Sequence, residues 1–144
     1  MKTVYCFLVM LLSLSAAAVP NEKVLESFTS SFPHADSVQW YEGDHDYNVY
    51  FLQDGIRCRV WYDELGNVKK SLRYYDGSKL PPLVLGNLSK KYPDLKIFGV
   101  TELSSPEQFV YQIAMEDDKK WYMVNADATG NLSMTSKLTK ADKN

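Results

Sequence analysis

The segment Gly43-Asp44-His45-Asp46 brings together side chains that can bind a divalent metal ion. Carboxylate oxygens and imidazole nitrogens are ordinary ligands for such ions. Three adjacent residues on one loop rarely surround a cation without further ligands, and the sequence offers no obvious second cluster. A solvated turn is therefore the favoured interpretation, with no bound metal and no cofactor expected. A metal or small-ligand carrier that uses the Asp44–Asp46 loop is the alternative.

Nucleophilic catalysis has one candidate, the thiol of Cys58. Cys58 alternates in phase with Ile56 and Val60, which places it on the apolar side of its predicted strand. Burial disfavours the thiolate that would react, so this thiol is expected to be inert. The two histidines, His34 and His45, lie in loop-like stretches without the rigid frame that serine catalysis needs. We therefore predict no catalytic residues and no enzymatic activity.

Two Asp-x-x-Gly-Asn strings stand 64 positions apart, from Asp63 to Asn67 and from Asp127 to Asn131. They resemble part of a calcium loop, but they lack its alternating acidic positions and its distal glutamate. Each string suits a tight turn in which the aspartate accepts hydrogen bonds and the glycine takes a positive φ angle. The repetition raises the question of whether one structural unit occurs twice.

The helices that precede these turns also repeat. Asn21 can cap a first helix, which Pro33 ends, and its apolar stripe consists of Val24, Leu25, Phe28 and Phe32. Sixty positions later, Pro81 and Pro82 suit a helix start and Pro93 ends the run. The second stripe consists of Val84, Leu85, Leu88 and Tyr92.

Each predicted helix is followed by four segments typical of strands. In the first half the apolar side chains are Val38, Trp40, Tyr47, Val49, Phe51, Ile56, Cys58, Val60 and Tyr62, and a last strand runs from Val68 to Tyr75. In the second half they are Phe98, Val100, Phe109, Tyr111, Ile113, Met115, Tyr122 and Val124, with a last strand near Leu132–Leu138. Hairpin turns are expected at Gln53-Asp54-Gly55 and at Glu116–Lys119.

These patterns predict an α+β protein made by tandem duplication of a helix followed by a four-stranded antiparallel meander. The helices should pack on one face of a curved sheet. The first repeat spans 19–76, a linker spans 77–82, and the second repeat spans 83–144. A unit of about 60 residues has only a marginal core, so both repeats are expected to form one compact domain.

Residues 1–18 predict a secretory signal peptide. Lys2 provides a positive start, an apolar run extends from Val4 to Leu14, and small residues favour cleavage after Ala18. We therefore expect a periplasmic or secreted protein without a membrane span after cleavage. Removal of Lys2 leaves 15 basic against 18 acidic residues, a net charge of −3. This balance argues against nucleic acid as a partner.

Fold-determining positions in both halves carry a family resemblance. They are Phe32-Pro33, Ala35, Val38, Trp40, Tyr47, Val49, Phe51, Tyr62-Asp63, Gly66, Tyr92-Pro93, Ile97, Val100, Glu102, Tyr111, Ile113, Asp127 and Gly130. Over nearly all of the mature chain, the sequence resembles the PepSY-like proteins related to the β-lactamase inhibitor protein, a group of small exported bacterial proteins. The resemblance implies two α+β units with helices on one face of a curved antiparallel sheet. It also implies that the other face is free to bind a protein.

Strand alternation identifies the side chains that point away from the helices. This outward set consists of Tyr50, Arg57, Arg59, Trp61, Trp121 and Met123, and Arg73 and Tyr75 join it if the strand from Val68 has the same phase. A one-sided sheet normally shows polar side chains to water, whereas these residue types dominate protein interfaces. Coverage by loops or by the other repeat, or cross-strand pairing, is the alternative explanation.

The leading hypothesis is an exported, non-enzymatic protein-binding module that uses this face. It could act as an inhibitor or regulator of a periplasmic or secreted enzyme such as a peptidase, so its expected partner is an envelope or secreted protein. The alternatives are the small-ligand or metal carrier and a structural accessory of an envelope assembly. Pattern and composition make no prediction about the oligomeric state.

Overall fold

The computed structural model describes residues 18–141, so the predicted signal peptide lies outside the described residues except for Ala18. A helix and four strands are followed by a short 3-10 helix, a second helix and four more strands. The helices are α1 (Glu22–Ser31), η1 (Gly77–Lys79) and α2 (Pro82–Lys91). The strands are β1 (Asp36–Glu42), β2 (Asp46–Gln53), β3 (Ile56–Asp63), β4 (Val68–Tyr75), β5 (Lys96–Ser104), β6 (Phe109–Glu116), β7 (Lys120–Ala126) and β8 (Leu132–Thr139).

Both predicted helices form, and their ends follow from local chemistry. The Asn21 side chain caps α1, because its Oδ1 accepts a hydrogen bond from the Val24 amide at 3.0 Å. Helix α2 instead begins after Pro81, which makes no side-chain cap hydrogen bond. Pro33 and Pro93 follow the two helix ends, as predicted. Within residues 18–141, neither helix is long and apolar enough to cross a membrane.

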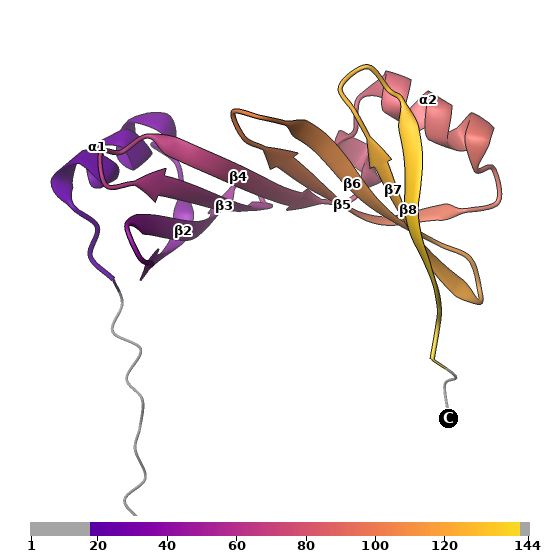
Figure 1. Ribbon diagram of the computed structural model, residues 1–144, viewed down its shortest axis with the longest axis horizontal. Coiled ribbons are helices and arrows are strands. Elements are labelled where there is room, and N and C mark those ends of the chain that lie inside the picture. The colour runs from indigo at the N-terminus through magenta and orange to yellow at the C-terminus, as the bar shows by residue number, and fades with distance from the viewer. Residues whose placement is uncertain (1–17, 142–144) are drawn as a thin grey trace, which may run out of the picture.

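All eight strands pair antiparallel in sequence order and form one open sheet. Figure 1 shows the two helices towards opposite ends of the molecule, with β4 and β5 between them. Directly paired residues share a face of the sheet, and Cys58 pairs with Arg73, Arg73 with Glu102, and Glu102 with Tyr111. Because Cys58 packs in the core beneath α1 and Tyr111 in the core beneath α2, both helices cover the same face. The expected α+β architecture is therefore present.

The core is divided into two clusters under the two helices. The first consists of Val24, Phe28, Val49, Phe51, Cys58, Val60 and Tyr62. The second consists of Leu80, Val84, Leu88, Val100, Tyr111, Ile113, Met115, Tyr122, Val124 and Ala126. Between them, Arg73 Nη1 on β4 lies 3.1 Å from Glu102 Oε1 on β5. The sheet is thus continuous, whereas an ion pair separates its two apolar cores.

The two Asp-x-x-Gly-Asn strings form matching turns. The Asp63 Oδ1 atom accepts hydrogen bonds from the amides of Leu65 and Asn67, both at 2.9 Å. Asp127 Oδ1 accepts the equivalent bonds from Thr129 and Asn131, and Gly66 and Gly130 both have φ +85°. The turn interpretation is therefore confirmed, because both carboxylates are occupied by the turn itself.

Two predicted strand phases are wrong. Phe98 is 63% exposed, because a register shift between Ile97 and Gly99 leaves it pointing away from the core. Arg73 and Tyr75 lie on the helix-covered face, so they do not extend the outward set. The corresponding outward residue between them is Tyr74, which pairs with Arg57.

Candidate functional site

The helix-free side of the sheet, called the open face below, carries every member of the predicted outward set. Tyr50 pairs with Arg59 and Arg59 with Leu72, so these side chains share the side opposite the buried Val60. Continuing the register across β4–β7 places Met123 on the same side. The placement predicted by alternation is therefore observed, and it raises the question of which residues touch.

Side chains from three neighbouring strands form a cluster around Arg59. The Arg59 guanidinium carbon lies 4.2 Å from the ring centroid of Tyr50 on β2 and 4.3 Å from that of Trp61 on β3. Lys70 on β4 places its Nζ atom 4.4 Å from the Trp61 ring centroid. Cations over aromatic faces at such distances are attracted by the ring quadrupole. We call Asn48, Tyr50, Arg59, Trp61 and Lys70 the Arg59 cluster.

Asn48 fixes the orientation of the central guanidinium. Arg59 Nε and Nη2 donate hydrogen bonds to Asn48 Oδ1 at 3.1 and 2.8 Å. Asn48 is only 8% exposed, so its amide oxygen depends on Arg59 for compensation. The stacking rings and the buried acceptor together restrict the Arg59 side chain.

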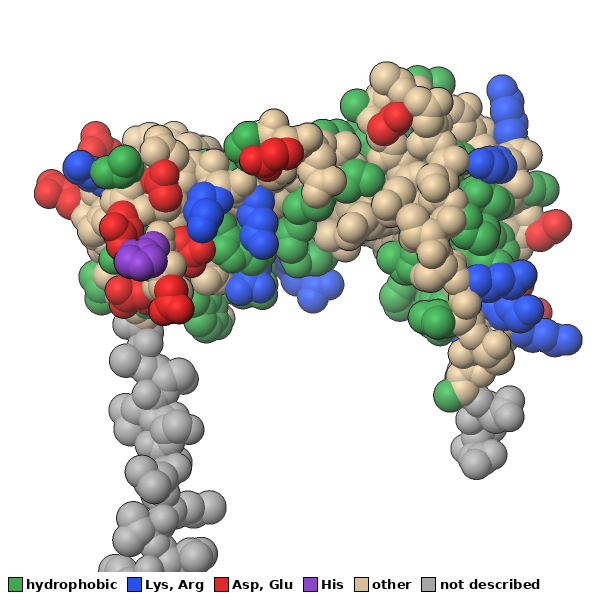
Figure 2. All heavy atoms as spheres, in the orientation of Figure 1, with side chains coloured by type: hydrophobic (Ala, Val, Ile, Leu, Met, Phe, Trp, Pro, Cys, Tyr) green, Lys and Arg blue, Asp and Glu red, His purple; other side chains and the backbone are tan. Residues whose placement is uncertain are grey.

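Two hollows lie on the open face at either end of the β4–β5 pair. One has a volume of about 660 Å³, and its lining includes Trp61, Lys70 and Leu103 with the β5–β6 loop at Pro106. The other has a volume of about 470 Å³ and is lined in part by Arg57, Tyr74 and Phe98. Lys and Arg side chains gather beside hydrophobic ones from the left half towards the middle of the molecule in Figure 2, whereas acidic side chains dominate the lower left. The centre of the open face therefore offers concave, partly apolar and basic surface.

Trp121 and Met123 lie apart from the Arg59 cluster. They are on β7, four strands from β3, which is about 19 Å at the usual spacing between neighbouring strands. Trp121 packs edge-to-face against Phe98, with ring centroids 4.8 Å apart, and Lys140 Nζ lies 4.5 Å from its ring centroid. The structure therefore divides the predicted set into two patches on one face.

Four open-face residues escaped prediction. The sequence prediction assigns no face to Asn48 and Lys70, Tyr74 lies on a strand without clear alternation, and Phe98, which it places on the inward face, lies beside a bulge. The alternation of β2 could have identified Asn48, because it points to the same side as Tyr50. Lys70 and Tyr74 depend on how β4 pairs with β3, and Phe98 depends on the register shift between Ile97 and Gly99.

The residues considered above for catalysis or metal binding are buried, exposed to solvent or paired with other side chains. Cys58 is buried, as predicted, and burial raises the pKa of its thiol. The His45 side chain is 91% exposed and lies 3.4 Å from a Glu64 oxygen, while Asp46 pairs with Lys69 at 2.9 Å. In the part of the chain that the structure describes, no group of three or more His, Cys, Asp or Glu side chains is placed to hold a metal ion.

Comparison with known proteins finds likeness in structure alone. No protein-family profile matches the chain, and no curated protein matches it in sequence. A BLIP-like protein from Bacteroides fragilis superposes with a TM-score of 0.69 and 20% identity, over 90% of this chain and 94% of its own. A DUF2874 family protein from Bacteroides ovatus gives a TM-score of 0.64 and 22% identity, over 85% and 89%.

A third solved structure is a candidate periplasmic protein from Bacteroides eggerthii. It gives a TM-score of 0.65 at 16% identity and covers 85% of this chain and 90% of its own. At such low sequence identities the similarity shows a shared fold only. The superposed part covers most of this chain. The resemblance to proteins related to the β-lactamase inhibitor protein is thus confirmed in three dimensions: this chain has the BLIP-like fold.

Proposed function

We propose that this protein is an exported, non-enzymatic binding module that recognises another protein through its open face. The observation that carries the proposal is Arg59, held between Tyr50 and Trp61 and tied to the buried Asn48. A solvated sheet face has no need of such an arrangement, since isolated polar side chains would suffice. A partner-binding face benefits from it.

The physical advantage is preorganisation. Ordering a flexible side chain at an interface costs about 0.5–1.5 kcal/mol, and Arg59 is restricted before binding. Two of its N–H groups donate to Asn48, which leaves further guanidinium donors for carbonyl or carboxylate groups of a partner. Trp61 and Tyr50 supply large apolar area beside these donors, the combination typical of interface hot spots.

The solved structures support the same class of function. One of them is named as BLIP-like and another as a candidate periplasmic protein, and the fold leaves one sheet face without helices. Within that class, the protein acts as an inhibitor or regulator of an envelope or secreted enzyme, such as a peptidase. The predicted signal peptide, cleaved after Ala18, delivers it to the periplasm or the medium.

The duplication of one PepSY-like unit belongs to the same proposal. Repeats 19–76 and 83–144 flank the linker 77–82, whose last residue is the first of α2, and each half has a helix followed by four strands. The matching hydrogen bonds of Asp63 and Asp127 support a common origin for the halves. Both units would then have kept the fold, and only the first would have acquired the Arg59 cluster.

Affinity capture from an envelope extract of the source organism tests the proposed function. The bait is the mature protein beside an Arg59→Ala, Trp61→Ala double variant, and a Trp121→Ala variant examines the second patch. We expect the wild type to retain a partner that the double variant loses. Calorimetry with the purified partner should then reproduce this difference in binding.

A matched control separates the two faces. Lys90→Ala with Phe109→Ala also removes one cation and one aromatic ring, but Lys90 is on α2 and Phe109 pairs with Ser104 on the helix-covered face. This control should retain the partner. Capture that survives the Arg59 and Trp61 changes but fails in the control would reject the open face as the binding surface.

A further inference from the structure

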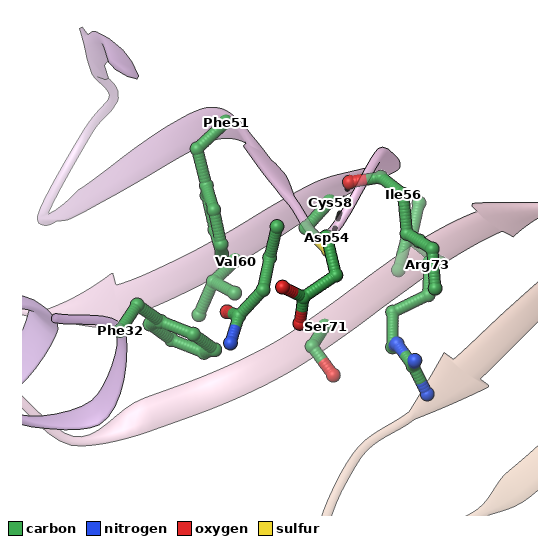
Figure 3. Close-up of a pocket in the computed structure, with 10 residues that line it drawn as sticks. Phe32, Phe51, Asp54, Ile56, Cys58, Val60, Ser71 and Arg73 are labelled. Carbon is green, nitrogen blue, oxygen red and sulfur yellow. Dashed lines mark hydrogen bonds between the residues drawn. The ribbon is translucent and has the colours of Figure 1, made fainter. Parts of the chain in front are cut away.

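A further concave site lies on the opposite, helix-covered face. A cavity of about 260 Å³ opens between the end of α1, the β2–β3 turn and β4, with apolar walls that include Phe32, Phe51 and Ile56. Figure 3 shows the Asp54 carboxylate near Ser71 on one side of this space and the Phe32 ring on the other. The site therefore combines an aromatic wall with one carboxylate, away from the Arg59 cluster.

The charges around this cavity favour a cation. Arg73 also lines it, but Arg73 Nη1 donates hydrogen bonds to both Glu102 carboxylate oxygens at 3.1 and 3.3 Å, which offsets its charge. None of the ion pairs among residues 18–141 includes Asp54. Glu102 does not line the cavity, but its pairing with Arg73 leaves Asp54 as the uncompensated charge of the lining, which would repel an anion.

The end of α1 adds to this preference. The carbonyl end of a helix carries partial negative charge, and Phe32 is the C-cap of α1. The last turn of α1 contains no basic residue, whereas that of α2 contains Lys90 and Lys91. The rings of Phe32 and Phe51, with centroids 4.7 Å apart, offer faces and edges to an apolar stem and to a cation.

We propose that this cavity binds a small organic cation, an ammonium or guanidinium group on a short apolar stem. The cationic group lies beside Asp54 and within reach of the Ser71 hydroxyl, and the stem lies against Phe32 and Phe51. The volume admits a group the size of a lysine or arginine side chain. This site lies on the opposite face of the sheet from the Arg59 cluster, and its proposed ligand does not depend on the proposed function of the open face.

Butylguanidinium is the probe, and butylurea is its neutral counterpart of nearly the same shape. Titration of the ¹⁵N-labelled mature protein should shift the amides of Ile56 and Ser71 with butylguanidinium at millimolar concentrations. Butylurea should bind at least about fivefold more weakly, because it loses an ion pair worth about 1 kcal/mol. A separate titration with blocked arginine methylamide shows whether the cavity also binds an arginine side chain that belongs to a peptide.

Asp54→Asn tests the carboxylate with little risk to the fold. Asp54 has φ +51°, a conformation that asparagine also adopts readily. This variant should bind butylguanidinium about fivefold more weakly, while the exposed Asp118→Asn should bind as the wild type does. Equal binding of butylurea, unchanged affinity in Asp54→Asn, or no saturable shift would overturn the proposal.

Discussion

The two halves of the sheet match on the helix-covered face and differ on the open face. At an offset of 64 positions, the inward Val49 corresponds to Ile113 and Val60 to Val124, and all four are buried. On the open face, the members of the Arg59 cluster have different counterparts. Asn48 corresponds to Gln112, Tyr50 to Ala114, Arg59 to Met123 and Trp61 to Asn125.

This contrast separates what the fold requires from what it allows. Inward positions must remain apolar, because each half has to build a core from about 60 residues and such a core is marginal. Outward positions carry no such requirement, and only the first half combines a buried amide, two rings and two cations there. The difference between the two halves is therefore concentrated on the open face.

Deletion of a core side chain should give the largest effect. Phe51 contacts the rings of Phe28 and Phe32, and Phe51→Ala should lower the free energy of unfolding by about 3–5 kcal/mol. Its counterpart Met115→Ala should cost about 2–5 kcal/mol. Urea titration measures both values.

The same variants test whether the halves are one cooperative unit. Because neither half has a large core, amide hydrogen exchange should accelerate on β2 and on β6 in each variant. Acceleration confined to the altered half would mean that the two cores unfold independently despite the continuous sheet.

The two matching turns should respond unequally to alanine. At Gly66 an added Cβ would lie 2.8 Å from the backbone oxygen of Lys23 in α1, whereas at Gly130 it meets side-chain atoms of Asn87 and Leu83. Both glycines have positive φ, which costs alanine about 1–2 kcal/mol. We expect a total of about 2–3 kcal/mol for Gly66→Ala and about 1–2 kcal/mol for Gly130→Ala. Equal losses of stability for the two variants in thermal unfolding would show that the α1 backbone moves away from an added Cβ as easily as the side chains of Asn87 and Leu83 do.

Exchange of Arg59 for its counterpart should have a smaller cost. Arg59→Met removes both donors to Asn48 Oδ1 and leaves a buried acceptor uncompensated, so stability should fall by about 1–2 kcal/mol. Arg57→Met, at an exposed position on the same strand, should change it by less than about 0.5 kcal/mol. Similar unfolding midpoints for the two variants would show that Asn48 does not depend on Arg59.

The smallest expected difference between the halves is in how acid affects the stability that Asp63 and Asp127 contribute. Hydrogen bonds from Thr129 and Asn131 lower the pKa of Asp127 to about 2, and Asn67 lowers that of Asp63. A carboxyl with a depressed folded-state pKa stabilises the fold above its unfolded pKa of about 4 and loses this contribution as pH falls towards 2. Asp127→Asn should therefore flatten the decline in melting temperature between pH 4 and 2 more than Asp63→Asn does. The reverse order would mean that the Thr129 hydroxyl is not the deciding contact.

Local patterns were sufficient for the helices, the tight turns and most strand phases. The Asn21 cap, Pro33 and Pro93 act within one helical turn, and the alternation of Tyr47–Phe51 reports burial directly. The strand from Val68 to Tyr75 failed because it mixes charged, polar and aromatic residues without a period of two. Phe98 failed because its bulge depends on pairing with β6.

The amino-acid sequence by itself determined the element order, the inward face of each regular strand and the turn chemistry, because these depend on neighbours a few residues away. Only the tertiary structure decided that the outward set forms two patches, that Asn48 restrains Arg59, and that a carboxylate faces an aromatic cavity beside α1. Those outcomes depend on which strands lie side by side and on where register shifts occur. They result from packing of the whole sheet, which no stretch of sequence specifies alone.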